Sequence, residues 1–97
     1  MFLAIVSYDV CTRTPEGRRR LRQVARACED YGQRVQNSVF ECWVSSENFL
    51  MLRKRLVDIM DAGEDSVRIY FLGERWKGRV EHLGVKSVLD PQGPLIL

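Results

Sequence analysis

A continuous apolar run, Phe2 to Tyr8, stands near the start of the chain and ends at a carboxylate, Asp9. Its length and its content of β-branched and aromatic residues favour a strand that is buried on both faces. The chain has 97 residues, of which 45% are apolar, and this is ample for one core. We therefore expect a single domain over residues 1–97, with a buried strand that presents Asp9 at its end.

A helix is predicted to follow this strand, after a loop that runs from Cys11 to Gly17. Pro15 suits the first turn of a helix, and Thr14 suits the N-cap position before it. Helical spacing continues to about Asp30, and Gly32 is expected to end the helix as its C-terminal glycine. The apolar stripe consists of Leu21, Val24, Ala25 and Cys28, and the opposite side carries Arg19, Arg22 and Arg26.

Three strands and a second helix are expected in the next part of the chain. Asn37 and Ser38 interrupt a strand-like stretch and predict a tight turn, so this stretch forms a hairpin. The second helix has apolar residues at helical spacing and is expected to stop at Gly63. In order, the predicted elements are the hairpin over Arg34–Val44, the helix capped by Ser45 or Ser46, and a strand over Asp65–Leu72.

The predicted order of strand, helix, strand, strand, helix and strand is that of the ferredoxin-like α+β fold. This fold places the first and last main strands together near the sheet centre, with both helices on one face. The open apolar face and the apolar end Leu95–Leu97 favour a homodimer. We expect a core over about 1–72 and a tail over about 73–97, in which Val85–Leu89 forms a short strand and the end pairs with the partner's sheet.

Positive charge is concentrated between Cys11 and Gln36, where seven arginines stand against three acidic residues. Because the net charge of the chain is only +2, this segment carries most of the positive field. Such a basic stripe favours an anionic partner, nucleic acid first, although a solvated helix face has the same composition. The candidate phosphate-binding residues are Arg13, Arg18, Arg19, Arg22, Arg26 and Arg34.

The three cysteines, Cys11, Cys28 and Cys42, are odd in number and contain no CxxC pair. They fit neither a disulfide framework nor a zinc site. The opening apolar run is short and lacks a basic leader, and no stretch reaches the ~18–20 apolar residues that span a bilayer. We therefore expect a soluble cytoplasmic protein in a reducing compartment, with no membrane partner.

Asp9 is the first candidate for chemistry, because ligand sites favour the ends of central strands. A hard cation such as Mg²⁺, or Mn²⁺ in its place, needs only one or two carboxylates and completes its shell with waters and phosphate oxygens. Such an ion activates water against a phosphodiester. An Asx-turn or loop-capping aspartate is the alternative interpretation. The polar residues at 36–38 either hold a site beside Asp9 or only form the turn, and His82, the only histidine, is expected to be structural.

Several stretches together resemble CRISPR-associated protein 2, the small partner of the CRISPR integrase. They are IVSYDV at 5–10, GQRVQNSVFEC at 32–42, DSVRIY at 65–70, VEHLG at 80–84, and the closing DP and PLIL. The resemblance covers nearly the whole length in the right order. A strand that ends in Tyr-Asp is a weak signal alone, the run through Arg34, Gln36, Ser38, Phe40 and Glu41 is more specific, and the combination of all the stretches is strong.

The resemblance implies a ferredoxin-like homodimer that exchanges its C-terminal strand. Two copies of Asp9 would face each other across the axis and hold a divalent ion, usually Mg²⁺, with Tyr8, Ser38 and Phe40 supporting the site. Family members are metal-dependent endonucleases on RNA or double-stranded DNA, and they bridge two integrase dimers during spacer acquisition. There the arginine-rich surface would touch DNA. The alternatives are a non-catalytic DNA scaffold, a ribonuclease toxin of the same fold, and a small-molecule regulatory domain.

Overall fold

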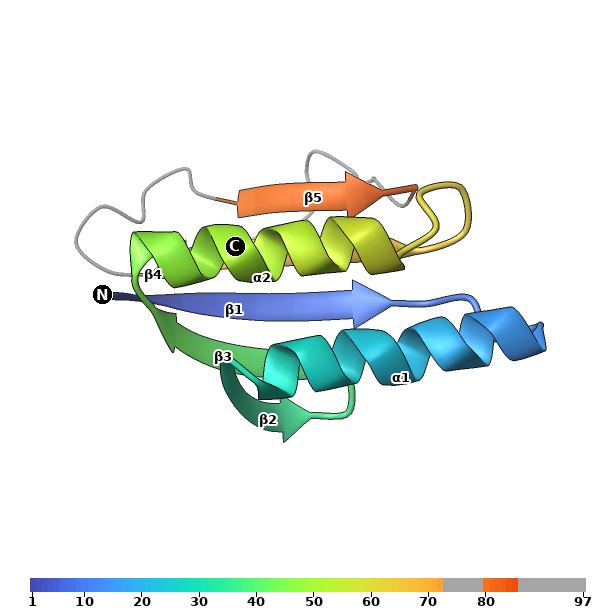
Figure 1. The fold of residues 1–97 in the computed structure, drawn as a ribbon, viewed down its shortest axis with the longest axis horizontal. Helices are drawn as coiled ribbons and strands as arrows, with labels where there is room; N and C mark the ends of the chain where they lie inside the picture. Colours follow the sequence, from blue (N-terminus) through green and yellow to red (C-terminus); the bar gives the residue numbers. More distant parts are fainter. Residues whose placement is uncertain (73–79, 86–97) are drawn as a thin grey trace, which may run out of the picture.

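Five strands and two helices make up the part of the protein that the structure describes. The structure is a computed structural model, and it describes residues 1–72 and 80–85. In chain order the elements are β1 (Phe2–Asp9), α1 (Pro15–Glu29), β2 (Gly32–Gln36), β3 (Val39–Val44), α2 (Ser46–Ile59), β4 (Ser66–Leu72) and β5 (Val80–Gly84) (Figure 1).

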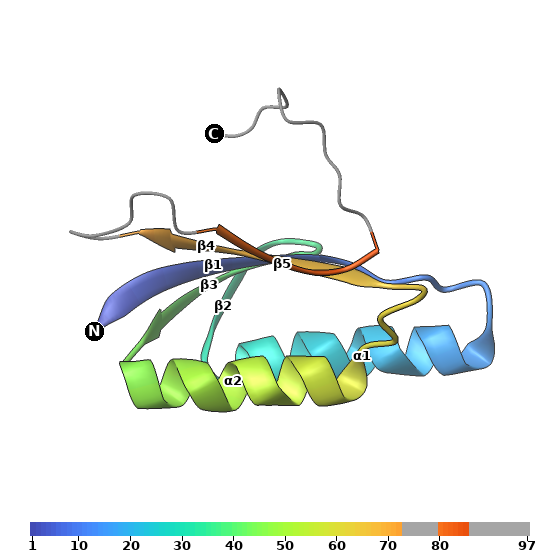
Figure 2. The same ribbon diagram turned by 90° about the horizontal axis from the view of Figure 1, so that it is seen from above.

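The strands form one sheet in the order β2-β3-β1-β4-β5, and every neighbouring pair is antiparallel. β1 is the middle strand, and both helices pack on one face of the sheet (Figure 2). This confirms the predicted ferredoxin-like α+β arrangement, with β5 added at the β4 edge. Among the described helices, none is long and apolar enough to cross a membrane.

The core lies between the sheet and the two helices, and this layer decides how β1 is buried. Ala4, Val6 and Tyr8 are buried, whereas Leu3 and Ile5 between them remain partly exposed. The prediction that the strand is buried on both faces is therefore wrong for the single chain. Successive side chains of a strand point to opposite faces, and the described helices cover only one of them.

The start of α1 agrees with the prediction, but its end and its buried stripe do not. The Thr14 hydroxyl oxygen accepts a hydrogen bond from the backbone N–H of Gly17 at 3.0 Å, as an N-cap should. The helix ends at Glu29, so Gly32 is not its C-terminal glycine but the first residue of β2. The buried face consists of Gly17, Val24, Ala27 and Cys28, while Leu21 and Ala25 are only partly buried.

Glycine is needed at position 32 because β3 passes close to the backbone there. A Cβ on Gly32 would lie 2.3 Å from the carbonyl oxygen of Glu41. Gly63 does not end α2 either, because that helix stops at Ile59 and Gly63 lies in the following turn. Gly32 thus marks a close packing contact and Gly63 marks a turn, so the prediction that each of them ends a helix was wrong.

A fifth strand that the sequence did not predict runs over Val80–Gly84 and pairs with β4. The short strand predicted over Val85–Leu89 lies outside the described residues, apart from Val85. Gly84 has a φ of 109°, and a Cβ there would lie 2.0 Å from the carbonyl oxygen of Asp65, so only glycine fits this approach. Residues 86–97, including the predicted partner-exchanging end, are outside the described part of the chain.

Candidate functional site

Asp9 is the last residue of β1, where the sequence placed it. Its main chain is opposite Ser66 of β4 in the register of the sheet. On the other side, the backbone N–H of Tyr8 donates to the carbonyl oxygen of Ser38 at 3.1 Å. The Asp9 residue is exposed, whereas Tyr8 beside it is buried towards the helices. By strand alternation Asp9 therefore belongs to the open face of the sheet, at the end of its central strand.

The predicted supporting residues surround the β2–β3 turn next to this strand end. The Tyr8 ring stacks on Phe40 with centroids 6.1 Å apart, and the Arg34 guanidinium carbon lies 5.0 Å from the Phe40 ring centre. Arg34 donates to the carbonyl oxygen of Asn37 at 2.6 Å, and the Tyr8 hydroxyl donates to the same oxygen at 3.4 Å. The structure thus brings Tyr8, Arg34, Ser38 and Phe40 together at the end of β1, with the Tyr8 and Phe40 rings in the core on the face of the sheet opposite to Asp9.

Burial defines what Tyr8 can do in this cluster. Burial raises the pKa of the Tyr8 phenol above its ordinary value, and the Arg34 charge opposes the change only partly. The residue is 5% exposed and its ring is enclosed by the core. Tyr8 is therefore a neutral packing residue that fixes the strand end, and its face is not available for stacking on a base.

The donor chemistry at the strand end suits a hard cation. A carboxylate oxygen is a ligand that Mg²⁺ accepts while it keeps most of its waters. Within residues 1–72 and 80–85, no group of three or more histidine, cysteine, aspartate or glutamate residues could hold a metal ion. Asp9 of one chain can thus supply a single anchoring ligand, and waters, a phosphate or a second chain would have to supply the others.

The six arginine candidates separate into two groups. Arg19, Arg22 and Arg26 are exposed on the outer face of α1, where with Gln23 they line a shallow hollow. In the described part of the chain, no carboxylate lies within ion-pair distance of these three guanidinium groups. We call these three residues the basic face of α1. Three positive charges on one helical face, with no carboxylate partner among the described residues, are typical of a surface that attracts an anion.

The other three candidates are engaged with their own neighbours. Arg13 pairs with Glu64 at 3.2 Å, and Arg18 donates to the carbonyl oxygen of Thr12 at 3.0 Å. Arg34, besides its bond to the hairpin turn, lies 3.6 Å from a carboxylate oxygen of Glu29. These contacts do not prevent phosphate binding, but they reduce the free charge. The structure therefore does not bring all six arginines to one site.

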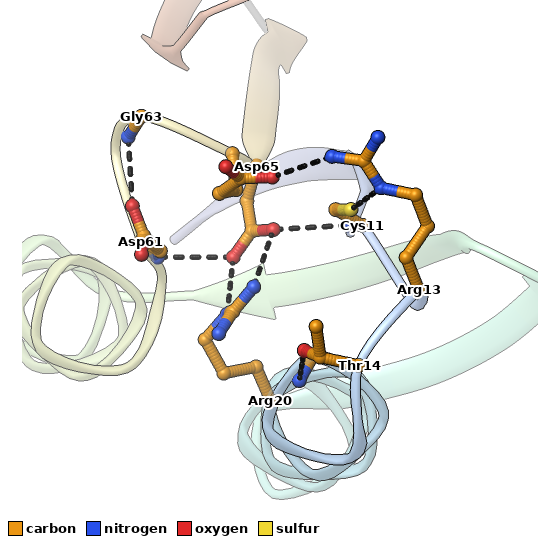
Figure 3. A network of polar contacts seen from close by, with 9 residues as sticks. Cys11, Arg13, Thr14, Arg20, Asp61, Gly63 and Asp65 are labelled. Carbon is orange, nitrogen blue, oxygen red and sulfur yellow. Dashed lines mark hydrogen bonds and ion pairs between the residues drawn. The ribbon is translucent and has the colours of Figure 1, made fainter.

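One polar cluster was missed by the sequence analysis, and it lies at the same end of the sheet. The Asp65 carboxylate is 0% exposed and forms a two-pronged ion pair with Arg20, at 2.7 and 3.3 Å (Figure 3). Arg20 had been counted only as part of the basic stripe. Its position on the same helical face as Gly17 and Val24 was the available signal, because an arginine in a buried stripe needs an acidic partner.

The remaining candidates have structural positions. Cys28 and Cys42 are fully buried, and burial raises the pKa of their thiols to about 12 and about 11. All three cysteines, including the partly exposed Cys11, are free thiols. His82 lies in β5, opposite Arg68 of β4. Nothing in the chemistry of the strand end requires these residues.

Known proteins are similar to this chain in fold and share about half of its residues. A family model described as CRISPR associated protein Cas2 matches residues 1–80. A protein of Nitratidesulfovibrio vulgaris named CRISPR-associated endoribonuclease Cas2 is 53% identical, over 98% of this chain and 93% of the relative. A protein of the same name from Chlorobaculum tepidum is 56% identical, over 98% of this chain and 99% of the relative.

A third relative and a solved structure extend the match. A protein of Halalkalibacterium halodurans named CRISPR-associated endonuclease Cas2 is 50% identical, over 97% of this chain and 98% of the relative. The crystal structure of Streptococcus pyogenes Cas2 at pH 6.5 superposes with a TM-score of 0.69 and 56% identity, over 84% of this chain and 99% of that chain. Since the match holds in sequence and in fold over nearly the whole length, this chain belongs to the Cas2 family of CRISPR associated proteins.

Proposed function

We propose that this protein is a homodimeric, Mg²⁺-dependent endonuclease of the CRISPR system, acting on double-stranded DNA or single-stranded RNA in the cytoplasm. The exposed carboxylate of Asp9 at the end of the central strand is the observation that carries this proposal. Relatives that are 50–56% identical are named endoribonuclease or endonuclease. Mn²⁺ has the same preference for oxygen ligands and would substitute for Mg²⁺.

The homodimer is supported by an apolar row on the open face of the sheet. Leu3 of β1 is in register with Trp43 of β3 and with Leu72 of β4. Trp43 is 61% exposed and Leu72 is 40% exposed. Large apolar side chains aligned across three strands are typical of a surface that another protein covers, and a second copy is the simplest candidate. Because Asp9 belongs to the same face, a second copy would bring a second Asp9 to the site.

In this proposal each group of residues would have one role. Asp9 anchors the ion, and the ion when bound supplies a positive charge and a water of lowered pKa. The Tyr8–Phe40 stack and the hairpin turn keep the end of β1 in place. The basic face of α1 holds the phosphate backbone without reading its sequence. Because no group of three or more ligand residues is found in the described part of the chain, hydrolysis would rely on an ion that Asp9 holds together with waters, a phosphate or a second chain.

A non-catalytic scaffold is the second candidate function, and the basic face of α1 favours it specifically. Three exposed arginines without acidic partners among the described residues suit duplex binding whether or not any bond is cut. In this version the dimer positions DNA and bridges two dimers of the CRISPR integrase during spacer acquisition. Both versions need the dimer and the arginines, and only the first needs the Asp9 carboxylate.

An Asp9→Asn variant separates the two versions, because it removes the charge and keeps the shape of the side chain. Wild type and variant are incubated with labelled duplex DNA or single-stranded RNA, with Mg²⁺ or with EDTA, and binding is followed in parallel. Asp58→Asn is the matched control, since this carboxylate is exposed and makes only a surface pair with Lys54.

The nuclease proposal predicts Mg²⁺-dependent cutting by wild type and by the control. Asp9→Asn should then lose cutting while it keeps its affinity for nucleic acid. If wild type and Asp9→Asn cut equally, the cutting does not depend on this site. If both bind duplex DNA and neither cuts, the scaffold is the better description. Size-exclusion chromatography with light scattering tests the homodimer, and a monomer at micromolar concentration would contradict it.

A further inference from the structure

The Asp65 carboxylate connects three segments that are far apart in the sequence. One oxygen accepts hydrogen bonds from the backbone N–H of Cys11 at 3.0 Å and from Arg20 at 3.3 Å. The other accepts from Arg20 at 2.7 Å and from the backbone N–H of Asp61 at 2.9 Å. Figure 3 shows the carboxylate between α1, the loop after β1 and the turn after α2. Each oxygen is thus occupied by two N–H groups.

These contacts lie close to Asp9, both along the chain and across the sheet. Cys11, which Asp65 holds by its amide, is two residues beyond Asp9 along the chain. Ser66, the residue after Asp65, is the register partner of Asp9 in the sheet. The carbonyl oxygen of Asp65 also accepts from the backbone N–H of Val85, at the end of β5. The strand end that carries Asp9 is therefore held by two consecutive residues, since Asp65 bonds the chain just beyond Asp9 and Ser66 pairs with Asp9 in the sheet.

The same carboxylate ties Asp9 to the basic face of α1. Arg20, which is 17% exposed in its side chain, lies between Arg19 and Arg22 on that helix. Its guanidinium points inward to Asp65, while the basic face points outward to solvent. A planar fork that makes two hydrogen bonds permits little rotation or sliding of the helix against the sheet.

We propose that Asp65, through Arg20 and the Cys11 amide, is a positioning residue that sets the orientation of the Asp9 carboxylate relative to the phosphate-binding face of α1. This inference rests on the proposed function of Asp9 as the anchor of the metal ion. A ligand site needs its groups held to within about 0.5 Å, and outer residues that hold a metal ligand typically change metal affinity or activity by about 10–100-fold when replaced.

Burial would raise the pKa of Asp65, but the hydrogen bonds from Arg20, Asp61 and Cys11 more than offset it, so the pKa lies below its ordinary value. The group is thus an anion with four N–H donors around it. In an Asp65→Asn variant, one of the two oxygens becomes an NH₂ group. Whichever way the amide turns, this NH₂ faces two donors. The variant therefore breaks contacts on one side without changing the size of the side chain.

The test compares wild type, Asp65→Asn and the control Asp58→Asn at a temperature where circular dichroism shows all three to be folded. The first readout needs no catalysis. Amide NMR signals of residues 9–11 are followed, and the Mn²⁺ concentration that half-broadens the Asp9 signal is measured. The second readout is kcat and KM for the labelled nucleic acid with Mg²⁺.

We expect Asp65→Asn to shift the Cys11 amide signal and to raise the half-broadening Mn²⁺ concentration by about tenfold or more. The kcat should fall by a similar factor while KM stays within about twofold, because the basic face is intact. A purely structural role would alter melting alone. Unchanged Mn²⁺ broadening and unchanged kcat in a folded Asp65→Asn protein would therefore overturn the proposal.

Two further outcomes are covered by the design. If Asp65→Asn does not fold, Arg20→Lys takes its place, since it keeps the buried charge paired and loses only the fork geometry. The same shifts are then expected, and their absence counts against the proposal. If wild type cuts no nucleic acid, the nuclease proposal fails by itself. The Mn²⁺ and amide measurements still decide whether Asp65 orients Asp9.

Discussion

Removal of the basic face of α1 tests the nucleic-acid contact quantitatively. Arg19, Arg22 and Arg26 span seven residue steps of the helix, or about 10.5 Å at a rise of about 1.5 Å per residue. One DNA strand carries a phosphate every ~3.4 Å along the duplex axis, so this length corresponds to about three phosphates. Each chain can therefore make up to about three phosphate contacts through this face, and a homodimer about six.

The number of contacts sets the salt dependence of binding. Each neutralised phosphate contributes about 0.9 to the slope of log affinity against log salt concentration. A variant with glutamine at all three positions should lower the magnitude of this slope by about 2.7 per chain, or about 5.4 for a dimer that uses both faces. Between 50 and 200 mM salt, the contacts of one chain alone account for a loss of about 40-fold in wild-type affinity.

The assay is duplex DNA binding over a salt series, and the control removes charge from the other helix. Lys54→Gln with Arg55→Gln deletes two positive charges of α2 that are paired with Asp58 and Asp30. Because paired charges contribute little to a distant anion, this control should leave the slope nearly unchanged. If the α1 variant kept the wild-type slope, the assignment of phosphate contacts to the basic face of α1 would be refuted. If the control lost as much slope for each deleted charge as the α1 variant does, only the net charge of the protein would matter.

Two further predictions concern the core and the sheet. Cys28 and Cys42 have folded pKa values of about 12 and about 11 against an ordinary 9.0, so the unfolded chain loses these protons first as pH rises. The free energy of unfolding should therefore fall between about pH 9 and 11 by up to about 1.4 kcal/mol per pH unit for each thiol, and urea titrations of the Cys→Ala variants should show a flatter profile. Gly32→Ala places a Cβ 2.3 Å from the Glu41 oxygen and should cost about 1–3 kcal/mol in thermal unfolding. Gly63→Ala, whose Cβ would lie 3.4 Å from the movable Asp61 side chain, is its control, and equal melting of the two variants would contradict the packing argument.

Local signals carried most of the fold prediction. The N-cap at Thr14, the polar turn at 37–38 and the apolar run of β1 each depend on residues close in sequence, and the structure agrees with all three as element starts or turns. The same locality explains why β5 was not predicted. Residues 80–84 alternate weakly and include a charged residue and a histidine, so only their pairing with β4 identifies them as a strand.

The part of the candidate site that the sequence predicted also depends on local signals. Asp9 follows directly from the end of an apolar run, and the resemblance to a family supplied its chemistry. Arg20 and Asp65 are 45 residues apart, and nothing local indicates that they meet. The separation of the arginines into paired and unpaired groups likewise depends on which carboxylates the fold brings within reach, such as Glu64 beside Arg13. Sequence alone cannot distinguish these groups, because their composition is the same.

Asp9 and Asp65 lie at the same end of neighbouring strands, and the packing of α1 gives them opposite properties. Both are carboxylates, but each oxygen of Asp65 is occupied by two N–H donors, so the side chain has no free position for a cation. Asp9, by contrast, is exposed at the end of β1. Under the proposed function, a cation at this end of the sheet would therefore bind at Asp9 rather than at Asp65, because Arg20 already neutralises the Asp65 carboxylate. Among the described residues, no group of three or more such ligands could hold a metal ion, so the proposed site fits one ion shared across a dimer better than a pair of ions held by each chain separately.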